Sequence, residues 1–218
     1  MISTNELTSY KLQAEDGRAG TIKDVLFDDG RWTVRHFVVE SGGLLSKHKV
    51  ILDPMEALEP DPDEKGLPVR LTKDEIKRHP IPESDPPLSH STKRAGPDAM
   101  RSAGAGSMIG AGPTEVAFSG AGPAYESSYL DPDPRLRSVS DVQDYKLRSG
   151  TQEIGKVTDF VLNPENWTVP FAVVELEDEH RQVLLPTDQI SKIGFPDRVL
   201  ETEMMPELLH DAKPFEGY

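Results

Sequence analysis

Cysteine is absent from the 218 residues, which excludes disulfide bonds, a thiolate nucleophile and cysteine-ligated zinc. Long apolar runs are missing too, so no stretch is hydrophobic enough to span a bilayer. The first residues also lack the basic and apolar regions of a signal peptide. We therefore expect a soluble, cytoplasmic protein with no transmembrane segment.

Positive charge is scarce. The sequence has 24 Lys and Arg against 38 Asp and Glu, and its net charge is −14 at pH 7. Acidic residues outnumber basic ones by 15 to 12 in residues 1–80, seven to three in 81–134 and 16 to nine in 135–218. A surface that binds nucleic acid needs clustered Lys and Arg. We therefore predict no nucleic-acid binding.

Motifs of catalysis and cofactor binding are also missing. The sequence has no P-loop, no dinucleotide-binding fingerprint and no His-Glu-x-x-His metal motif. Its six histidines show no repeated spacing. Glu177 to His180 fits a solvated turn better than a cation site. We predict that the protein is not an enzyme and has no resident cofactor or metal.

What the sequence does contain is an internal repeat. The nine residues WTVRHFVVE at 32–40 return as WTVPFAVVE at 167–175, which is 135 positions later. Gly20 and Asp24 align with Gly155 and Asp159 at the same offset. Both copies are rich in Val, Phe and Trp, which favour strands. Asp28-Asp29-Gly30 between two apolar stretches favours a tight hairpin turn. The sequence therefore predicts a duplicated β unit.

The pattern places about six short strands and one short helix in each copy. In the first, we expect a helix from the capping box of Thr72 and Glu75 to about Arg78, before Pro80. In the second, we expect the helix within residues 202–209. The predicted strands cover 10–14, 20–27, 32–40, 49–52, 57–58 and 69–71, then 145–148, 154–162, 167–175, 183–186, 189–193 and 198–200. Closing such a small sheet into a barrel would remove its exposed edges.

A region of different composition separates the copies. Nine of the 19 prolines and seven of the 17 glycines lie between Pro80 and Pro134. We predict three regions: a first β domain at 1–80, a largely flexible Gly/Pro/Ala-rich linker at 81–134, and a second β domain at 135–218. Within the linker, residues 116–118 are either scattered apolar residues or a strand that docks on an open sheet edge.

The repeated residues resemble the PRC-barrel family, in particular bacterial proteins with two such barrels joined by a variable linker. The resemblance is carried by the segments 20–24, 32–40 and 50–52, by their counterparts 155–159, 167–175 and 183–186, and by the lead-in at 133–138. It implies an all-β fold of two small PRC-type barrels with short C-terminal helices. One departure is Pro170, where the first copy has Arg35; because proline cannot donate to a ladder, we expect an edge or a bulge there.

The residues that recur are the candidates for a functional role. Gly20, Asp24, Gly155 and Asp159 are repeat positions to which we assign a structural role, in which each Asp caps backbone amides after a glycine bulge. A catalytic carboxylate pair would have to lie within about 5–10 Å, whereas these two belong to different domains. For contact with a protein partner we single out four residues: Trp32, Leu44, Leu45 and Trp167.

The resemblance also implies a function. Relatives include the cytoplasmic domain of the photosynthetic reaction-centre H subunit and the C-terminal domain of a ribosome maturation factor, in which the barrel resembles a scaffold. We expect a non-catalytic interaction module, in a bacterial stress or housekeeping role, that binds an unknown protein or itself. Two alternatives stay open: a reaction-centre-like accessory that modulates electron or proton transfer, and a small-ligand or metal-binding module.

Overall fold

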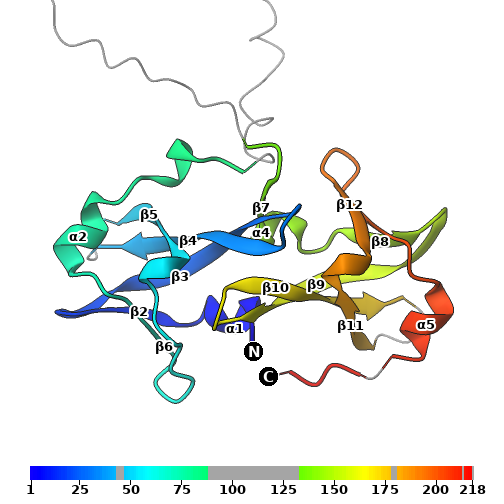
Figure 1. Cartoon of the computed structure of the whole chain (residues 1–218), viewed down its shortest axis with the longest axis horizontal. Coiled ribbons are helices and arrows are strands. Elements are labelled where there is room, and N and C mark those ends of the chain that lie inside the picture. Colours follow the sequence, from blue (N-terminus) through cyan, green and yellow to red (C-terminus); the bar gives the residue numbers. More distant parts are fainter. Residues whose placement is uncertain (43–46, 88–132, 178–180, 213, 218) are drawn as a thin grey trace, which may run out of the picture.

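A computed structural model describes residues 1–42, 47–87, 133–177, 181–212 and 214–217 (Figure 1). The described part of the first half contains six strands, two short α-helices and two 3₁₀ turns. They are β1 (Ile2–Ser3), α1 (Thr4–Leu7), β2 (Lys11–Ala14), β3 (Gly17–Asp28), β4 (Thr33–Ser41), β5 (His48–Leu52), η1 (Pro54–Glu56), β6 (Gly66–Pro68), α2 (Lys73–Arg78) and η2 (Pro82–Ser84).

The described part of the second half repeats this order with small changes. Its elements are β7 (Leu136–Ser138), α4 (Val139–Val142), β8 (Lys146–Ser149), β9 (Gln152–Asn163), β10 (Thr168–Leu176), β11 (Gln182–Pro186), η3 (Thr187–Gln189), β12 (Ile190–Gly194), β13 (Val199–Thr202) and α5 (Pro206–His210). The dominance of strands over a few short helices confirms the all-β prediction.

All thirteen of these strands belong to one sheet. Its main path runs β12-β13-β8-β9-β10-β4-β3-β2-β6, and the path does not return on itself, so the sheet is open. The two halves lie side by side along the long axis of the molecule (Figure 1). On the main path they join where β10 meets β4, through the single residue pair Thr168 and Thr33.

Predicted local features can be compared with the structure directly. The capping box of Thr72 and Glu75 is present, and α2 ends at Arg78, as expected. The register of β9 and β10 shifts between Thr168 and Phe171, which confirms a bulge at Pro170. The C-terminal helix, α5, starts only at Pro206, because Thr202 still pairs with Ile190 at the end of β13.

Two predicted strands of the first copy are displaced. Ala57 forms only an isolated bridge with Val69, and the strand expected at 69–71 lies at Gly66–Pro68. There it pairs in parallel with β2, because Leu67 is buried beside Leu12. Most of the predicted linker, including residues 116–118, lies outside the described residues.

The lead segments of the two repeats, residues 2–7 and 136–142, are exchanged. β1 pairs with β9 of the second repeat, Ile2 opposite Leu162. β7 pairs with β3 of the first repeat, Leu136 opposite Asp28. Figure 1 shows α1, next to the N-terminus, below β10 of the second half. Each repeat therefore completes the sheet of the other.

Because the lead segments are exchanged, the hydrophobic core contains residues of both repeats. The larger buried cluster combines residues of both repeats, among them Leu7, Phe27, Phe160 and Leu162. A smaller cluster consists of Leu26, Val38, Ile51 and Leu136, so the lead segment of the second repeat covers an apolar patch of the first. Within the described parts of the chain, no helix has the length and apolar character needed to cross a membrane.

Candidate functional site

The repeated aspartates lie at equivalent bulges in the two long strands. The β3–β4 register shifts between Ile22 and Asp24, and the β9–β10 register shifts beside Asp159. Oδ1 of Asp24 accepts from the N–H of Val25 at 2.8 Å, and Oδ1 of Asp159 accepts from the N–H of Phe160 at 2.8 Å. Each carboxylate therefore satisfies a backbone donor in the irregular part of its strand.

Both aspartates also hold the lead segment of the opposite repeat. Asp24 accepts from the hydroxyls of Ser138 at 2.5 Å and Ser140 at 2.8 Å, and from the N–H of Ser140 at 3.1 Å. Asp159 accepts from the hydroxyl of Thr4 and from the N–H of Asn5 at 3.1 Å. Asp24 thus accepts four hydrogen bonds and Asp159 three, which is the arrangement of a structural latch.

The repeated glycines allow two strands to approach closely at the start of each bulge. A Cβ on Gly20 would collide with the carbonyl oxygen of Glu40, and one on Gly155 would collide with that of Glu175. Since both obstacles are backbone atoms, no rotamer change could relieve the collision. The two glycines are needed for strand pairing, and they contact no cleft in common.

The repeated tryptophans lie where the two repeats meet. The N–H of Val34 donates to the carbonyl of Trp167 at 2.8 Å, and the N–H of Val169 donates to the carbonyl of Trp32 at 2.7 Å. Both tryptophans have a positive φ, 53° for Trp32 and 52° for Trp167, because each ends a tight turn. The rings pack inward: Trp167 meets Phe37 edge-on at 4.8 Å between ring centroids.

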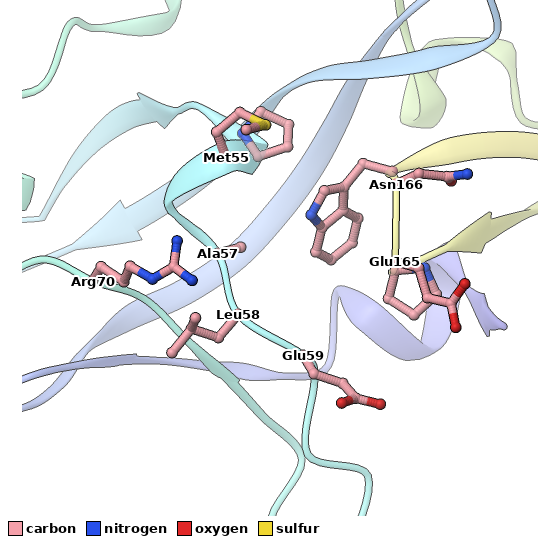
Figure 2. Close-up of a pocket in the computed structure, with 10 residues that line it drawn as sticks. Met55, Ala57, Leu58, Glu59, Arg70, Glu165 and Asn166 are labelled. Carbon is pink, nitrogen blue, oxygen red and sulfur yellow. The ribbon is translucent and has the colours of Figure 1, made fainter.

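Beside Trp167 lies a cleft of ≈ 400 Å³ between the first repeat and the β9–β10 turn of the second. We call it the apolar cleft. Figure 2 shows Met55, Ala57 and Leu58 on one side and the turn residues Glu165 and Asn166 on the other. Met55 is 79% exposed and Leu58 is 38% exposed. Pro54, Glu59, Arg70, Pro164 and Trp167 complete its lining.

A second cleft of ≈ 370 Å³ lies at the equivalent position beside Trp32. We call it the basic cleft. Here the β3–β4 turn of the first repeat faces β12 of the second, so the roles of the repeats are reversed. The lining consists of Asp29, Gly30, Trp32, Arg135, Arg137, Ile190, Ser191, Lys192 and Ile193. The molecule thus has two clefts of similar size built on one scaffold, with different chemistry in each.

Two carboxyl groups near the clefts have altered acidity. Burial raises the pKa of Asp29, and the nearby Arg137 guanidinium, 2.6 Å away, opposes that rise. Burial likewise raises the pKa of Glu56, and His79, 3.5 Å away, opposes it. Oε2 of Glu56 is buried and has no hydrogen-bond partner among the residues that the structure describes. In both groups, desolvation by burial is the largest cause of the shift.

The structure separates the sequence-predicted residues. Trp167 and Trp32 line one cleft each, whereas Asp24 and Asp159 line neither and act as latches. Leu44 and Leu45 lie outside the described residues. Sequence reasoning missed Met55, Leu58 and Arg135; a comparison of non-identical repeat positions beside the aligned tryptophans could have found them. In the described ranges, no group of three His, Asp or Glu side chains could hold a metal ion.

Comparison with known proteins adds no relatives to this description. No protein-family model matches the chain, and no curated protein matches it with significant similarity. A function for the chain has to be inferred from the geometry and chemistry of its two clefts.

Proposed function

We propose that the protein is a non-catalytic interaction module that binds a protein partner in the apolar cleft. The observation that carries this proposal is the exposure of Met55 and Leu58 beside Trp167. Large exposed apolar side chains gathered around a concave site mark binding surfaces more often than isolated exposed residues do. Methionine suits such a surface because its flexible thioether adapts to different partners.

The rim of the cleft indicates the chemistry of the partner. Glu59 and Glu165 are exposed on opposite sides, and Arg70 is the one cation in the lining. A neighbouring cleft of ≈ 200 Å³ shares Glu59 and Pro164 and adds Glu6 and Pro60. The two clefts offer apolar walls with acidic edges. They therefore fit a segment that presents a large apolar side chain flanked by Lys or Arg.

We further propose that each repeat is a small PRC-type barrel module and that the pair imitates a homodimer within one chain. The limited pairing between β4 and β10, a single residue pair, and the reciprocal pairing of β1 with β9 and of β7 with β3 support two equivalent units related as in a dimer. The family resemblance of the repeated segments supports a scaffolding role. The proposed setting is a bacterial one, with an unidentified protein or a second copy of the chain as partner.

The test compares two pairs of substitutions, each of which changes one exposed methionine and one exposed leucine. Met55→Asp with Leu58→Asp alters the apolar cleft, whereas Met205→Asp with Leu208→Asp alters residues on and next to α5 that are 61% and 54% exposed. Proteins captured by each variant from the native host are quantified by mass spectrometry. We expect a partner to be lost with the first pair and kept with the second. Equal recovery by both variants would contradict the proposal.

A further inference from the structure

We propose that the basic cleft binds a phosphate group carried by a small molecule. Three cations, Arg135, Arg137 and Lys192, line this cleft, and Asp29 is the one acid among its lining residues. The rest of the protein is strongly acidic, since the net charge is −14. A concave site of one sign concentrates ions of the opposite sign, so this cleft attracts anions.

The apolar cleft provides an internal comparison, because it occupies the equivalent place in the other repeat. By the repeat offsets, Ile2 stands where Arg137 does, and Glu59 stands where Lys192 does. Glu165 takes the place of Gly30. Since the scaffold forms a cleft of similar volume without any of these cations, folding does not require them. Their presence in one cleft only points to a ligand.

Arg137 is held in a fixed position. Its guanidinium lies 2.6 Å from Asp29 and donates to the carbonyl of Leu136 at 3.5 Å, and its side chain is 11% exposed. Arg137 thus neutralises Asp29 and forms the floor of the site. Its Nε–H is also buried and has no partner within the described parts of the chain.

Arg135 and Lys192 supply the charge that a ligand can use. Arg135 is exposed, and its charge acts on Asp29 more weakly than that of Arg137 does. It lies across Gly30, where an added Cβ would come within 3.0 Å of its Nη1, so the missing side chain makes room for it. Lys192 lies 3.8 Å from Glu201, which also pairs with Arg148 at 3.5 Å. The Glu201 carboxylate is therefore shared by Lys192 and Arg148.

The composition of the lining favours a phosphate ester over a bare ion. The arginine guanidinium presents parallel N–H donors that match the oxygens of a phosphate. Trp32, Ile190 and Ile193 provide apolar surface in the same cleft. A volume of ≈ 370 Å³ is within the range of small-molecule sites. The proposed ligand thus combines a phosphate with a compact apolar or aromatic part, as a nucleoside monophosphate does.

The proposal is tested by calorimetric titration of the full chain, in phosphate-free buffer at fixed ionic strength. The probes are a nucleoside monophosphate, the unphosphorylated nucleoside, inorganic phosphate, a tricarboxylate and a phosphoserine peptide. We expect the monophosphate to bind more tightly than inorganic phosphate, and the nucleoside not to bind. Absence of monophosphate binding, or binding of the tricarboxylate or the peptide alone, would overturn the proposal.

Substitutions then locate the site. Arg135→Ser and Lys192→Glu should each weaken monophosphate binding about tenfold or more, because each removes a charged hydrogen-bond donor. Lys23→Glu makes the same charge change at an exposed position of β3 and should leave the affinity unchanged. Arg70→Ser removes the cation of the apolar cleft and serves as a second control. Thermal melting verifies that all four variants are folded. Equal weakening by Lys23→Glu and Lys192→Glu would show that net charge alone governs binding, and would overturn the assignment to this cleft.

Discussion

Ser138 donates its hydroxyl hydrogen to Oδ2 of Asp24 over 2.5 Å and so fastens the lead segment of the second repeat to the bulge of the first. At the 135-residue offset Asp159 takes the place of Asp24, and it accepts from the lead segment of the first repeat, from the hydroxyl of Thr4 and from the N–H of Asn5, the counterpart of Ser140. The exchange is reciprocal. Neither repeat has its full set of strands and hydrogen bonds without the other, which makes the whole chain the folding unit.

Removal of the buried latch should destabilise the protein measurably. Asp159 is 6% exposed, and Asp159→Ala leaves the hydroxyl of Thr4 and the N–H of Asn5 without their acceptor and leaves the N–H of Phe160 only its longer contact with the Thr4 oxygen, at 3.4 Å. Unsatisfied buried donors of this kind cost about 1–3 kcal/mol each at most sites. We expect the free energy of unfolding in urea to fall by about that amount or more. Asp24→Ala should cost less, because Asp24 is less buried.

Glu203→Ala is the matched control for these substitutions. Glu203 is an exposed acid next to the end of β13, and its side chain makes no hydrogen bond or ion pair with the residues that the structure describes. Its removal should change stability by less than about 0.5 kcal/mol. A similar loss of stability in Glu203→Ala and Asp159→Ala would show that the latch contributes little.

The exchange of lead segments predicts the behaviour of a single repeat. A chain of residues 133–218 retains β7 and α4, but β3 of the first repeat, against which they pack, is gone. It also loses β1, and with it the partner of Leu162. Two copies can restore both contacts by exchanging lead segments around a two-fold axis. We expect a dimer by light scattering; a stable monomer that melts with the full chain would contradict the exchange.

The two tryptophans should differ in their contribution to stability, although they are repeat equivalents. Trp167 is 7% exposed and packs against Phe37, whereas Trp32 is half-buried and stacks on Phe27 at 5.5 Å. Trp167→Ala should cost about 3–5 kcal/mol, the usual range for a large buried aromatic side chain. Trp32→Ala should cost clearly less. Urea unfolding followed by circular dichroism measures both, and equal losses would contradict the difference in packing.

Much of the fold could be predicted from the sequence because its signals are local. The Val, Phe and Trp content of residues 32–40, the Asp28–Gly30 turn and the capping box at Thr72 all act over a few residues. The repeat then supplied the strand signal of residues 32–40 a second time, at 167–175. Pro170 was correctly placed at a bulge, because a residue without an N–H cannot join a regular ladder.

The remaining features depend on contacts between residues that are far apart in the sequence. Thr4 and Asp159 are 155 positions apart, and no local pattern links them. One signal was available: Ser3 and Ser138 share the repeat offset, and each caps the short helix that follows it. The clefts were missed for a different reason. They depend on positions at which the copies differ, such as Glu59 and Lys192, whereas a repeat draws attention to positions that agree.

Alkaline pH should destabilise the protein through Tyr10. Its ring is fully buried, and its hydroxyl donates to Oε1 of Glu6 at 3.0 Å. Burial and this hydrogen bond raise the pKa of Tyr10 from 10.0 to about 12. Because the unfolded chain releases this proton first, the contribution to stability is complete below pH 10 and is lost as the pH rises toward 12.

A comparison with Tyr10→Phe isolates this effect from the titration of lysines. A rise of two pKa units corresponds to about 2–3 kcal/mol of pH-dependent stability. We expect the unfolding free energy of the natural protein to fall by about that much more than that of Tyr10→Phe between pH 10 and 12. Parallel pH profiles for the two proteins would show that Tyr10 ionises equally in both states. Tyr145 lies at the equivalent position of the second repeat, and burial raises its pKa independently of Tyr10. The variant Tyr145→Phe should therefore keep the part of the pH-dependent stability that comes from Tyr10.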